Sequence, residues 1–317
     1  MKLIKPSVEI IREPDNMKRI ELCGRVCYKS EDRIADGTAE KFCQMLIERG
    51  HTAMLEHSNI IVQATGDGGL WDLISETIGF YEKNTGKPSM IRWSFDSERG
   101  SNGGMYTFSG NVRAWRELVR SSRGDIWFRG NPLFSDLPTG RVDLSEWAVN
   151  PSNLNPAERA RHDIITARFV CAEGVSLEMF RHRMAAATYE EAPAVCLSPA
   201  QESTRYVDYG GGDIQFVEPW WWNTNGENLE WARMYYEGMC KLSEEAYISI
   251  RSGKRAMPPQ AARALLTKAI KTEIVLTQTP ERWRDWLALR DDKGAHPDMQ
   301  ICARLFREAA RREGLPL

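Results

Sequence analysis

The sequence predicts a fold that mixes β-strands with α-helices. Short runs rich in β-branched residues are typical of strands, and longer runs with an apolar residue every three or four positions are typical of helices. The 317 residues contain both kinds of run. A doubly wound dinucleotide-binding fold is not expected, because no G-x-G-x-x-G turn stands between a strand and a helix. The one glycine triplet, Gly210-Gly211-Gly212, precedes a β-rich run and is interpreted as a turn.

Strands are expected where apolar residues are closely spaced without a helical period. In the first twelve residues, Val8 and Ile10 alternate with polar neighbours, which indicates a strand with one buried face. The expected strands are residues 1–12, 59–64, 163–171 and 272–277.

Helices are expected where capping residues and apolar periodicity coincide. Asp15-Asn16 offers an N-cap for a helix that ends at about Arg25, and Gly50 is a usual stop residue for a helix over 39–48. The other expected helices are residues 67–84, 228–252, a helix that begins at Pro258-Pro259, 280–290 and 297–312.

Length and charge limit the class of protein. A chain of 317 residues can bury a large core and does not require two domains, so we expect a single domain over residues 1–317. A net charge of −2 argues against a general nucleic-acid or membrane binder, since such proteins rely on a summed positive field. No apolar run of about eighteen residues is long enough to span a bilayer.

The seven cysteines are scattered, odd in number and without a C-x-x-C pair, which favours a reducing cytoplasm. Cys23 and Cys27 lie four positions apart on an expected helix. We interpret them as two small buried residues, because no second pair of ligands has a suitable spacing for a metal. No metal site is therefore expected.

Residues 121–160 are rich in Gly, Pro, Asn and Ser and show little periodicity. We interpret this segment as an insertion or a long surface excursion. Trp220-Trp221-Trp222 could stack on bases, but no basic residue is interleaved with it, so packing in a core or an interface is the better interpretation.

The stretch from Val175 to Tyr209 concentrates groups that bind anions. It contains Arg181-His182-Arg183 and, further on, Ser203-Thr204-Arg205. Guanidinium groups hold phosphate or carboxylate through two parallel hydrogen bonds, and a nearby hydroxyl can complete such a site. For R-H-R alone a solvated basic patch is the more common explanation. The serine and arginine in the same stretch favour a binding site.

R-H-R followed by S-x-R-Y resembles the signature of the flavin-dependent thymidylate synthases. In that family seven residues separate the second arginine from the serine, whereas 19 residues separate Arg183 from Ser203. The spacer is twelve residues longer, and we interpret the extra residues, within about 184–200, as a loop inserted beside the site.

Other segments resemble the same family in the same order, and together they cover about two thirds of the chain. They are C-Y-K-S at 27–30, G-H-x-x-x-L-E-H at 50–57, S-G-N-V-R-A-W at 109–115, A-R-x-L-L from Ala262, K-T-E-I-V from Lys271, W-R-D-W-L-A-L-R at 283–290 and A-H-P at 295–297.

The resemblance implies an α+β fold, a mostly antiparallel sheet with flanking helices, and a homotetramer with shared active sites. It also implies reductive methylation of dUMP to dTMP. Reduced FAD would supply hydride, methylenetetrahydrofolate the carbon, and NADPH would recharge the flavin. The family uses no cysteine nucleophile.

The resemblance further implies roles for single residues. Arg290 would be the catalytic residue, since a fixed positive charge there would stabilise ionised uracil N3. The cofactor-binding residues would be His51, Ala53, Glu56, Arg181, His182, Arg183, Gln201, Arg282 and Asp285. The substrate-binding residues would be Glu178, Arg181, Gln201, Glu202, Ser203, Thr204, Arg205, Arg263 and Arg290, with Met179 and Phe180 near the nucleotide and Ser203 and Arg205 on its phosphate.

The chain departs from the family pattern at several of these positions. Glu178 stands where a glutamine is usual and Gln201 where a glutamate is usual. The flavin-contacting Asn-x-Arg reads Thr279-Pro280-Glu281, with Arg282 one place late, and Asp285 replaces an Asn or His.

Three other functions remain open on the sequence. The longer spacer could reshape the pocket for another pyrimidine nucleotide, such as UMP. The departures at Thr279, Glu281 and Asp285 leave room for a protein that binds flavin or a nucleotide without methyl transfer. A structural protein with an incidental basic patch would bind neither.

Overall fold

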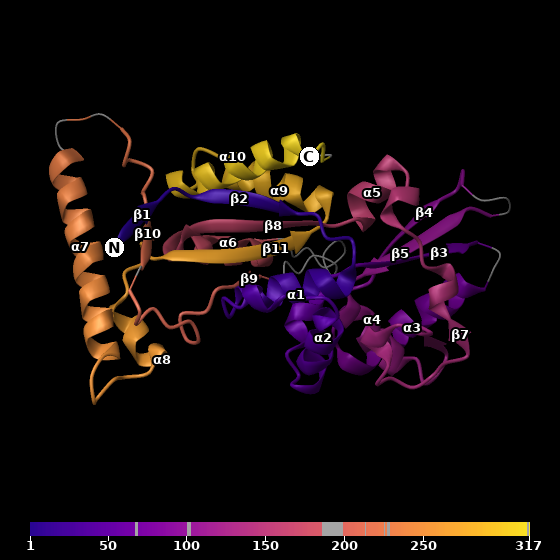
Figure 1. Ribbon diagram of the computed structural model, residues 1–317. Helices are drawn as coiled ribbons and strands as arrows, with labels where there is room; N and C mark the ends of the chain where they lie inside the picture. The colour runs from indigo at the N-terminus through magenta and orange to yellow at the C-terminus, as the bar shows by residue number, and fades with distance from the viewer. Residues whose placement is uncertain are drawn as a thin grey trace.

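The computed structural model describes residues 1–66, 69–99, 103–185, 199–212, 214–224, 226, 229–315 and 317, without the side chains of 181–185. Its main sheet runs through the centre of the molecule (Figure 1). The four strands lie in the order β2-β8-β11-β9 and are antiparallel to their neighbours. They are β2 (Ser7–Ile11), β8 (Ile165–Ala172), β11 (Lys271–Gln278) and β9 (Ala200–Gln201).

The expected strand over residues 1–12 is divided into two. Lys5 and Pro6 separate β2 from β1 (Lys2–Ile4), and β1 pairs in parallel with β10 (Gln215–Val217). Proline has no N–H for a ladder, so a break at this point is expected on physical grounds.

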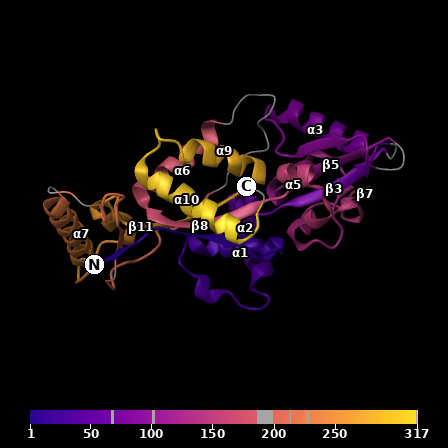
Figure 2. The ribbon, with the colours of Figure 1, turned by 90° about the horizontal axis from the view of Figure 1, so that it is seen from above.

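Helices cover both faces of the main sheet (Figures 1 and 2). Side chains alternate along β11: Ile274 and Leu276 are buried against one set of helices, and Val275 is buried with Cys23 and Val26 on the other face. The first face carries α6 (Glu173–Ala185), α9 (Pro280–Arg290) and α10 (Pro297–Arg312), and the second carries α1 (Asn16–Val26).

A second antiparallel sheet, in the order β3-β5-β4, belongs to the N-terminal half. Its strands are β3 (Ile60–Thr65), β5 (Met105–Gly110) and β4 (Arg92–Asp96). Phe108 and Trp115 are fully buried in the cluster between this sheet and its helices. These helices are α2 (Thr38–Glu48), α3 (Leu70–Thr85) and α4 (Val112–Ser121), with the 3₁₀ turns η1 (Glu31–Arg33) and η2 (Thr52–Glu56) beside them. The expected α+β class with a mostly antiparallel sheet is therefore confirmed.

Local capping chemistry explains why several helices begin where they do. The Asp15 carboxylate accepts a hydrogen bond of 2.9 Å from the Lys18 amide at the start of α1, as the sequence predicts. Asn111 caps α4 and Thr279 caps α9 in the same way.

Residues 121–160 are not a surface excursion. The segment forms two short parallel strands and four short helices, and its Phe128, Leu133, Phe134 and Leu144 are buried in the N-terminal core. The burial of these apolar groups outweighs the weak local pattern. The elements are β6 (Ile126–Trp127), β7 (Val142–Asp143), η3 (Pro132–Phe134), η4 (Leu144–Trp147), η5 (Pro151–Asn153) and α5 (Pro156–His162). That the segment is an insertion stays a prediction.

The long helix α7 (Leu229–Arg251) stands at one end of the molecule (Figures 1 and 2). The short α8 (Pro259–Ala262) and η6 (Arg263–Leu265) follow it. Trp221 and Trp222 pack on Tyr236 of α7, with ring centroids 5.8 and 5.6 Å away, so these two tryptophans are packing residues as expected. None of the helices in the described ranges combines the length and apolarity needed to cross a bilayer.

Candidate functional site

Helix α6 carries the R-H-R sequence in its last two turns. The backbone of 181–183 is helical, and the side chains of Arg181, His182 and Arg183 lie outside the described residues. Arg290, the last residue of α9, reaches α6: its Nη2 donates a 2.7 Å hydrogen bond to the carbonyl oxygen of Glu178. The predicted catalytic arginine therefore lies less than one helical turn from the predicted anion-binding sequence.

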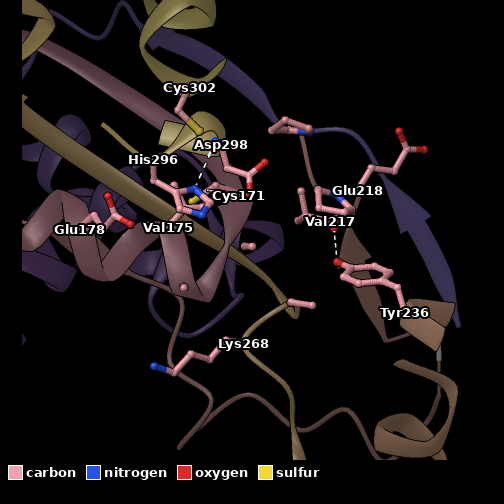
Figure 3. Close-up of a pocket in the computed structure, with 15 residues that line it drawn as sticks. Cys171, Val175, Glu178, Val217, Glu218, Tyr236, Lys268, His296, Asp298 and Cys302 are labelled. Carbon is pink, nitrogen blue, oxygen red and sulfur yellow. Dashed lines mark hydrogen bonds and ion pairs between the residues drawn. The ribbon is translucent and has the colours of Figure 1, made fainter. Parts of the chain in front are cut away.

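A cavity of about 290 Å³ opens beside Glu178 (Figure 3). Glu178, Lys268 and His296 bring groups of both charge signs to its wall. Burial raises the pKa of the Asp298 carboxyl there, although the amide of Trp220 donates to it. Such a wall suits a ligand with both hydrogen-bond donors and acceptors.

The β9 segment is attached to the same helix. Gln201 Nε2 donates to Ser176 Oγ of α6 at 2.9 Å and to Thr272 Oγ1 of β11 at 3.0 Å. Its amide is therefore engaged by the protein. The structure places Gln201 as a link between β9, β11 and α6.

Glu202 points into a buried network of charges. Its carboxylate accepts hydrogen bonds from Tyr209 Oη at 2.7 Å and from Lys271 Nζ at 2.8 Å. Lys271 and Lys29 both pair with Glu273, at 2.8 and 2.6 Å. Burial alone would raise the pKa of Glu273, but the bonds from the two lysines outweigh it and lower that pKa.

This network lines a cavity of about 420 Å³. Lys29 adopts a left-handed backbone conformation with φ +47°, which is costly for a residue with a Cβ. Its ion pair with Glu273, 244 residues away in sequence, holds it there. The strained lysine faces the segment that begins at Glu202.

Ser203, Thr204 and Arg205 follow at the surface. The amide of Ser203 donates to the carbonyl of Cys27 at 3.0 Å, and Ser203 Oγ accepts a 3.3 Å hydrogen bond from the Arg205 amide. Thr204 is half-buried and Arg205 is exposed, with its guanidinium 5.1 Å from the ring centre of Tyr206. An exposed guanidinium two residues from a hydroxyl is suited to receive a phosphate.

The predicted N-terminal cofactor residues lie on η2 or, for His51, just before it. His51 and Ala53 are exposed, whereas Glu56 is buried and pairs through Oε1 with Arg113 Nη1 at 2.7 Å. Glu56 Oε2 is buried without a hydrogen-bond partner, which leaves acceptor capacity for a ligand. His57 of the same motif is fully buried and bonded to Thr277, so it is a structural residue.

Arg282 and Asp285 form an ion pair of 3.1 Å on α9. Burial lowers the pKa of Arg92 of β4 to about 10, and the nearby positive charge of Arg282 acts in the same direction. Two neighbouring guanidinium groups fit a ligand that carries phosphates, as a flavin dinucleotide does.

Arg263 is placed apart from these groups. It is exposed on η6, next to α7 at the end of the molecule (Figure 1). Within one chain, the described contacts therefore join Glu178, Gln201 and Arg290 around α6. They do not join this group to Arg263 or to His51.

Sequence reasoning did not assign Lys29, Tyr209, Lys271 and Glu273 to the site. For Lys29, Lys271 and Glu273 the signal available was their presence in two family-like segments, C-Y-K-S and K-T-E-I-V. Nothing local showed that the two segments meet. Among the residues that the structure describes, no group of three or more His, Cys, Asp or Glu side chains could hold a metal ion.

The fold and this geometry define an α+β protein in which α9 and the β9 segment are both hydrogen-bonded to α6, the helix that ends in R-H-R. A model of the family described as thymidylate synthase complementing protein matches residues 157–314, about half of the chain. The chain belongs to this family.

Two known proteins are similar to this chain. The flavin-dependent thymidylate synthase of Mycolicibacterium gilvum (strain PYR-GCK) is 26% identical over 185 residues, which cover 55% of this chain and 72% of that protein. The crystal structure of thymidylate synthase X from Helicobacter pylori with FAD and dUMP is 20% identical. That match covers 48% of this chain and 70% of the other at a TM-score of 0.35, which does not establish a shared overall fold.

Proposed function

We propose that the protein is a flavin-dependent thymidylate synthase that methylates dUMP to dTMP. The observation that carries the proposal is that two hydrogen bonds converge on α6, the helix that ends in R-H-R. Gln201 bonds to Ser176, and Arg290 bonds to Glu178. Arginines from α6, α9 and the β9 segment thus belong to one connected structure. Family membership supports the same reading.

The chain's own residues bind and polarise the nucleotide. Ser203 and Arg205 hold the phosphate, with Glu178, Arg181, Glu202, Thr204 and Arg263 as further substrate contacts. Arg290 places a fixed positive charge where negative charge develops on the uracil, and a charge fixed in advance needs no reorganisation during the reaction.

The cofactor is FAD, held by His51, Ala53, Glu56, Arg181, His182, Arg183, Gln201, Arg282 and Asp285. The buried Glu56 oxygen without a hydrogen-bond partner and the neighbouring guanidinium groups of Arg92 and Arg282 support this assignment. Bound FAD supplies a hydride, methylenetetrahydrofolate is the carbon donor, and NADPH is the final reductant. No cysteine nucleophile takes part.

The active form is a homotetramer with shared active sites. Helix α7 supports an assembly, because one of its faces carries five large apolar side chains that are each more than half exposed: Trp231, Met234, Tyr235, Met239 and Leu242. The separation of Arg263 and His51 from the α6 group also suits a site completed by a second chain. The six described cysteines are free thiols, which supports a cytoplasmic location.

Anaerobic turnover tests the proposed reaction. Purified protein is incubated with FAD, NADPH, methylenetetrahydrofolate and dUMP, and dTMP is followed by chromatography, with UMP in a parallel reaction. Arg290→Ala and Arg290→Lys are compared with Arg312→Ala, an exposed arginine on α10. We expect dTMP from the wild type and from Arg312→Ala and a loss of about a hundredfold or more in Arg290→Ala. NADPH oxidation without dTMP would contradict the dUMP assignment.

A further inference from the structure

The two antiparallel sheets are built on one plan. The first unit runs through β3, α3, β4, β5 and α4, and the second through β8, α6, β9, β11 and α9. In each unit the chain order is strand, helix, edge strand, central strand and helix, and in the second unit β10, α7, α8 and η6 are added between β9 and β11. The sheet order is also the same, β3-β5-β4 in one and β8-β11-β9 in the other.

Equivalent residues make equivalent contacts. Ile60 pairs with Gly110 and Ile165 with Gln278, and in each case the next residue, Asn111 or Thr279, caps the last helix. In the first unit the indole Nε1 of Trp115 donates to the carbonyl of Ile60 at 3.0 Å.

In the second unit Trp283 Nε1 donates to the carbonyl of Ile165, also at 3.0 Å. Both tryptophans are fully buried. In both units, therefore, a buried tryptophan of the last helix is hydrogen-bonded to the first residue of the first strand.

Strand pairing then aligns the two edge strands. Tyr106 lies four residues before Gly110 and pairs with Phe95, whereas Ile274 lies four residues before Gln278 and pairs with Gln201. Phe95 therefore corresponds to Gln201. The first unit reads F-D-S-E-R from Phe95 and the second reads Q-E-S-T-R from Gln201.

Ser97 and Arg99 thus stand at the places of Ser203 and Arg205. The distance along the chain agrees as well: 35 positions separate Ile60 from Phe95 and 36 separate Ile165 from Gln201. The long spacer after R-H-R consequently has a counterpart of nearly equal length in the first unit.

Arg99 and Arg205 differ in their contacts. Arg205 is exposed and makes no ion pair with any of the described residues. Arg99 pairs with Glu158 of α5 and donates to the carbonyl of Asn153.

Glu158 is itself buried. Its carboxylate also accepts from Thr107 Oγ1 at 2.9 Å and from Gln63 Nε2 at 3.3 Å. A fixed internal carboxylate therefore binds the arginine of the first unit.

We propose that the first unit contains a closed counterpart of the nucleotide-phosphate site, in which the carboxylate of Glu158 occupies the position of the phosphate. This inference rests on the proposed role of Ser203 and Arg205. Glu158 brings one negative charge and acceptor oxygens to Arg99, as a phosphate would. The first unit is thereby kept from binding anions while its fold is retained.

Removal of the carboxylate should open this site. Glu158→Gln keeps a side chain of the same length for Thr107 and frees Arg99 from its charged partner. We expect inorganic phosphate to bind about tenfold more tightly than to the wild type, the scale of one charge-assisted hydrogen bond. Binding of dUMP should gain a second, weaker class of site. Phosphate is followed by ³¹P nuclear magnetic resonance and dUMP by equilibrium dialysis.

Controls separate this proposal from the proposed function. The added binding must vanish in Glu158→Gln/Arg99→Gln and be absent in Glu308→Gln, an exposed glutamate on α10. Glu158→Met, of similar volume, replaces Glu158→Gln if that variant does not fold. A folded variant that gains no phosphate binding overturns the proposal. Unchanged dUMP binding in Arg205→Gln would instead contradict the phosphate role of the second unit.

Discussion

Acid should destabilise this protein through two buried histidines. His57 Nδ1 is 2.8 Å from Thr277 Oγ1, and the ring of His162 lies between Ser94 and Ser109, 2.8 Å from each hydroxyl. Burial, followed by the positive charge of neighbouring arginines, lowers the pKa of each to about 3.

The sign and size of this pH effect on stability follow from proton linkage. In the unfolded chain each histidine titrates near ~6.5, so between pH 6.5 and about 3 the unfolded state binds more protons than the folded state. Stability is therefore complete above pH 6.5 and is lost as the pH falls. Between pH 7 and pH 5 the loss is about 2 kcal/mol for each histidine, or about 4 kcal/mol for both. This figure changes little for any folded pKa below about 4.

Urea unfolding at pH 7 and pH 5 measures the loss. His57→Asn and His162→Asn lower stability at both pH values, but each should reduce the difference between the two pH values by about 2 kcal/mol. Asparagine can keep one hydrogen bond and does not titrate. A difference that is the same in the wild type and in the double variant would refute the reasoning.

Three further outcomes are expected. Lys271→Met should lower the free energy of unfolding in urea by about 3–5 kcal/mol, because it leaves the buried carboxylate of Glu202 without its cation. Adding Glu202→Gln to this variant should restore part of the lost stability. Equal stability of the single and double variants would contradict the pairing. Arg205→Gln should weaken dUMP binding about tenfold or more by calorimetry and leave deoxyuridine binding unchanged, whereas loss for both ligands would contradict a phosphate contact. Trp231→Glu with Leu242→Glu should lower the mass measured by light scattering, and an unchanged mass would exclude this face of α7 from the assembly.

Much of the fold could be predicted from local chemistry. The Asp15 cap and the stop at Gly50 predict the first two helices to within about two residues, and alternation in residues 1–12 and the strand-like content of residues 163–171 predict strands of the main sheet. The same reasoning missed that residues 121–160, interpreted as an insertion or a surface excursion, contribute to a core. There, Phe128 and Phe134 belong to short apolar runs separated by glycine and proline, and only the tertiary structure shows that they fill a core.

The site was predictable only in part for a similar reason. R-H-R and S-T-R are visible as sequence, but the pairing of Lys29 with Glu273 joins residues 244 positions apart. The counterpart of Ser203 and Arg205 was hidden because Phe95 and Gln201 differ in chemistry and S-x-R is too short a pattern to stand out in the sequence. Register in the sheets, and not composition, makes them equivalent.

The two anchoring tryptophans give each half of the protein its own reporter. The indole protons of Trp115 and Trp283 are hidden from water and bonded to strand carbonyls. Exchange of such a proton with deuterated solvent requires the surrounding half to open. Among the indole signals of the 11 tryptophans, these two should therefore decay slowly and independently, and their rates would give the opening free energy of each half within the intact chain.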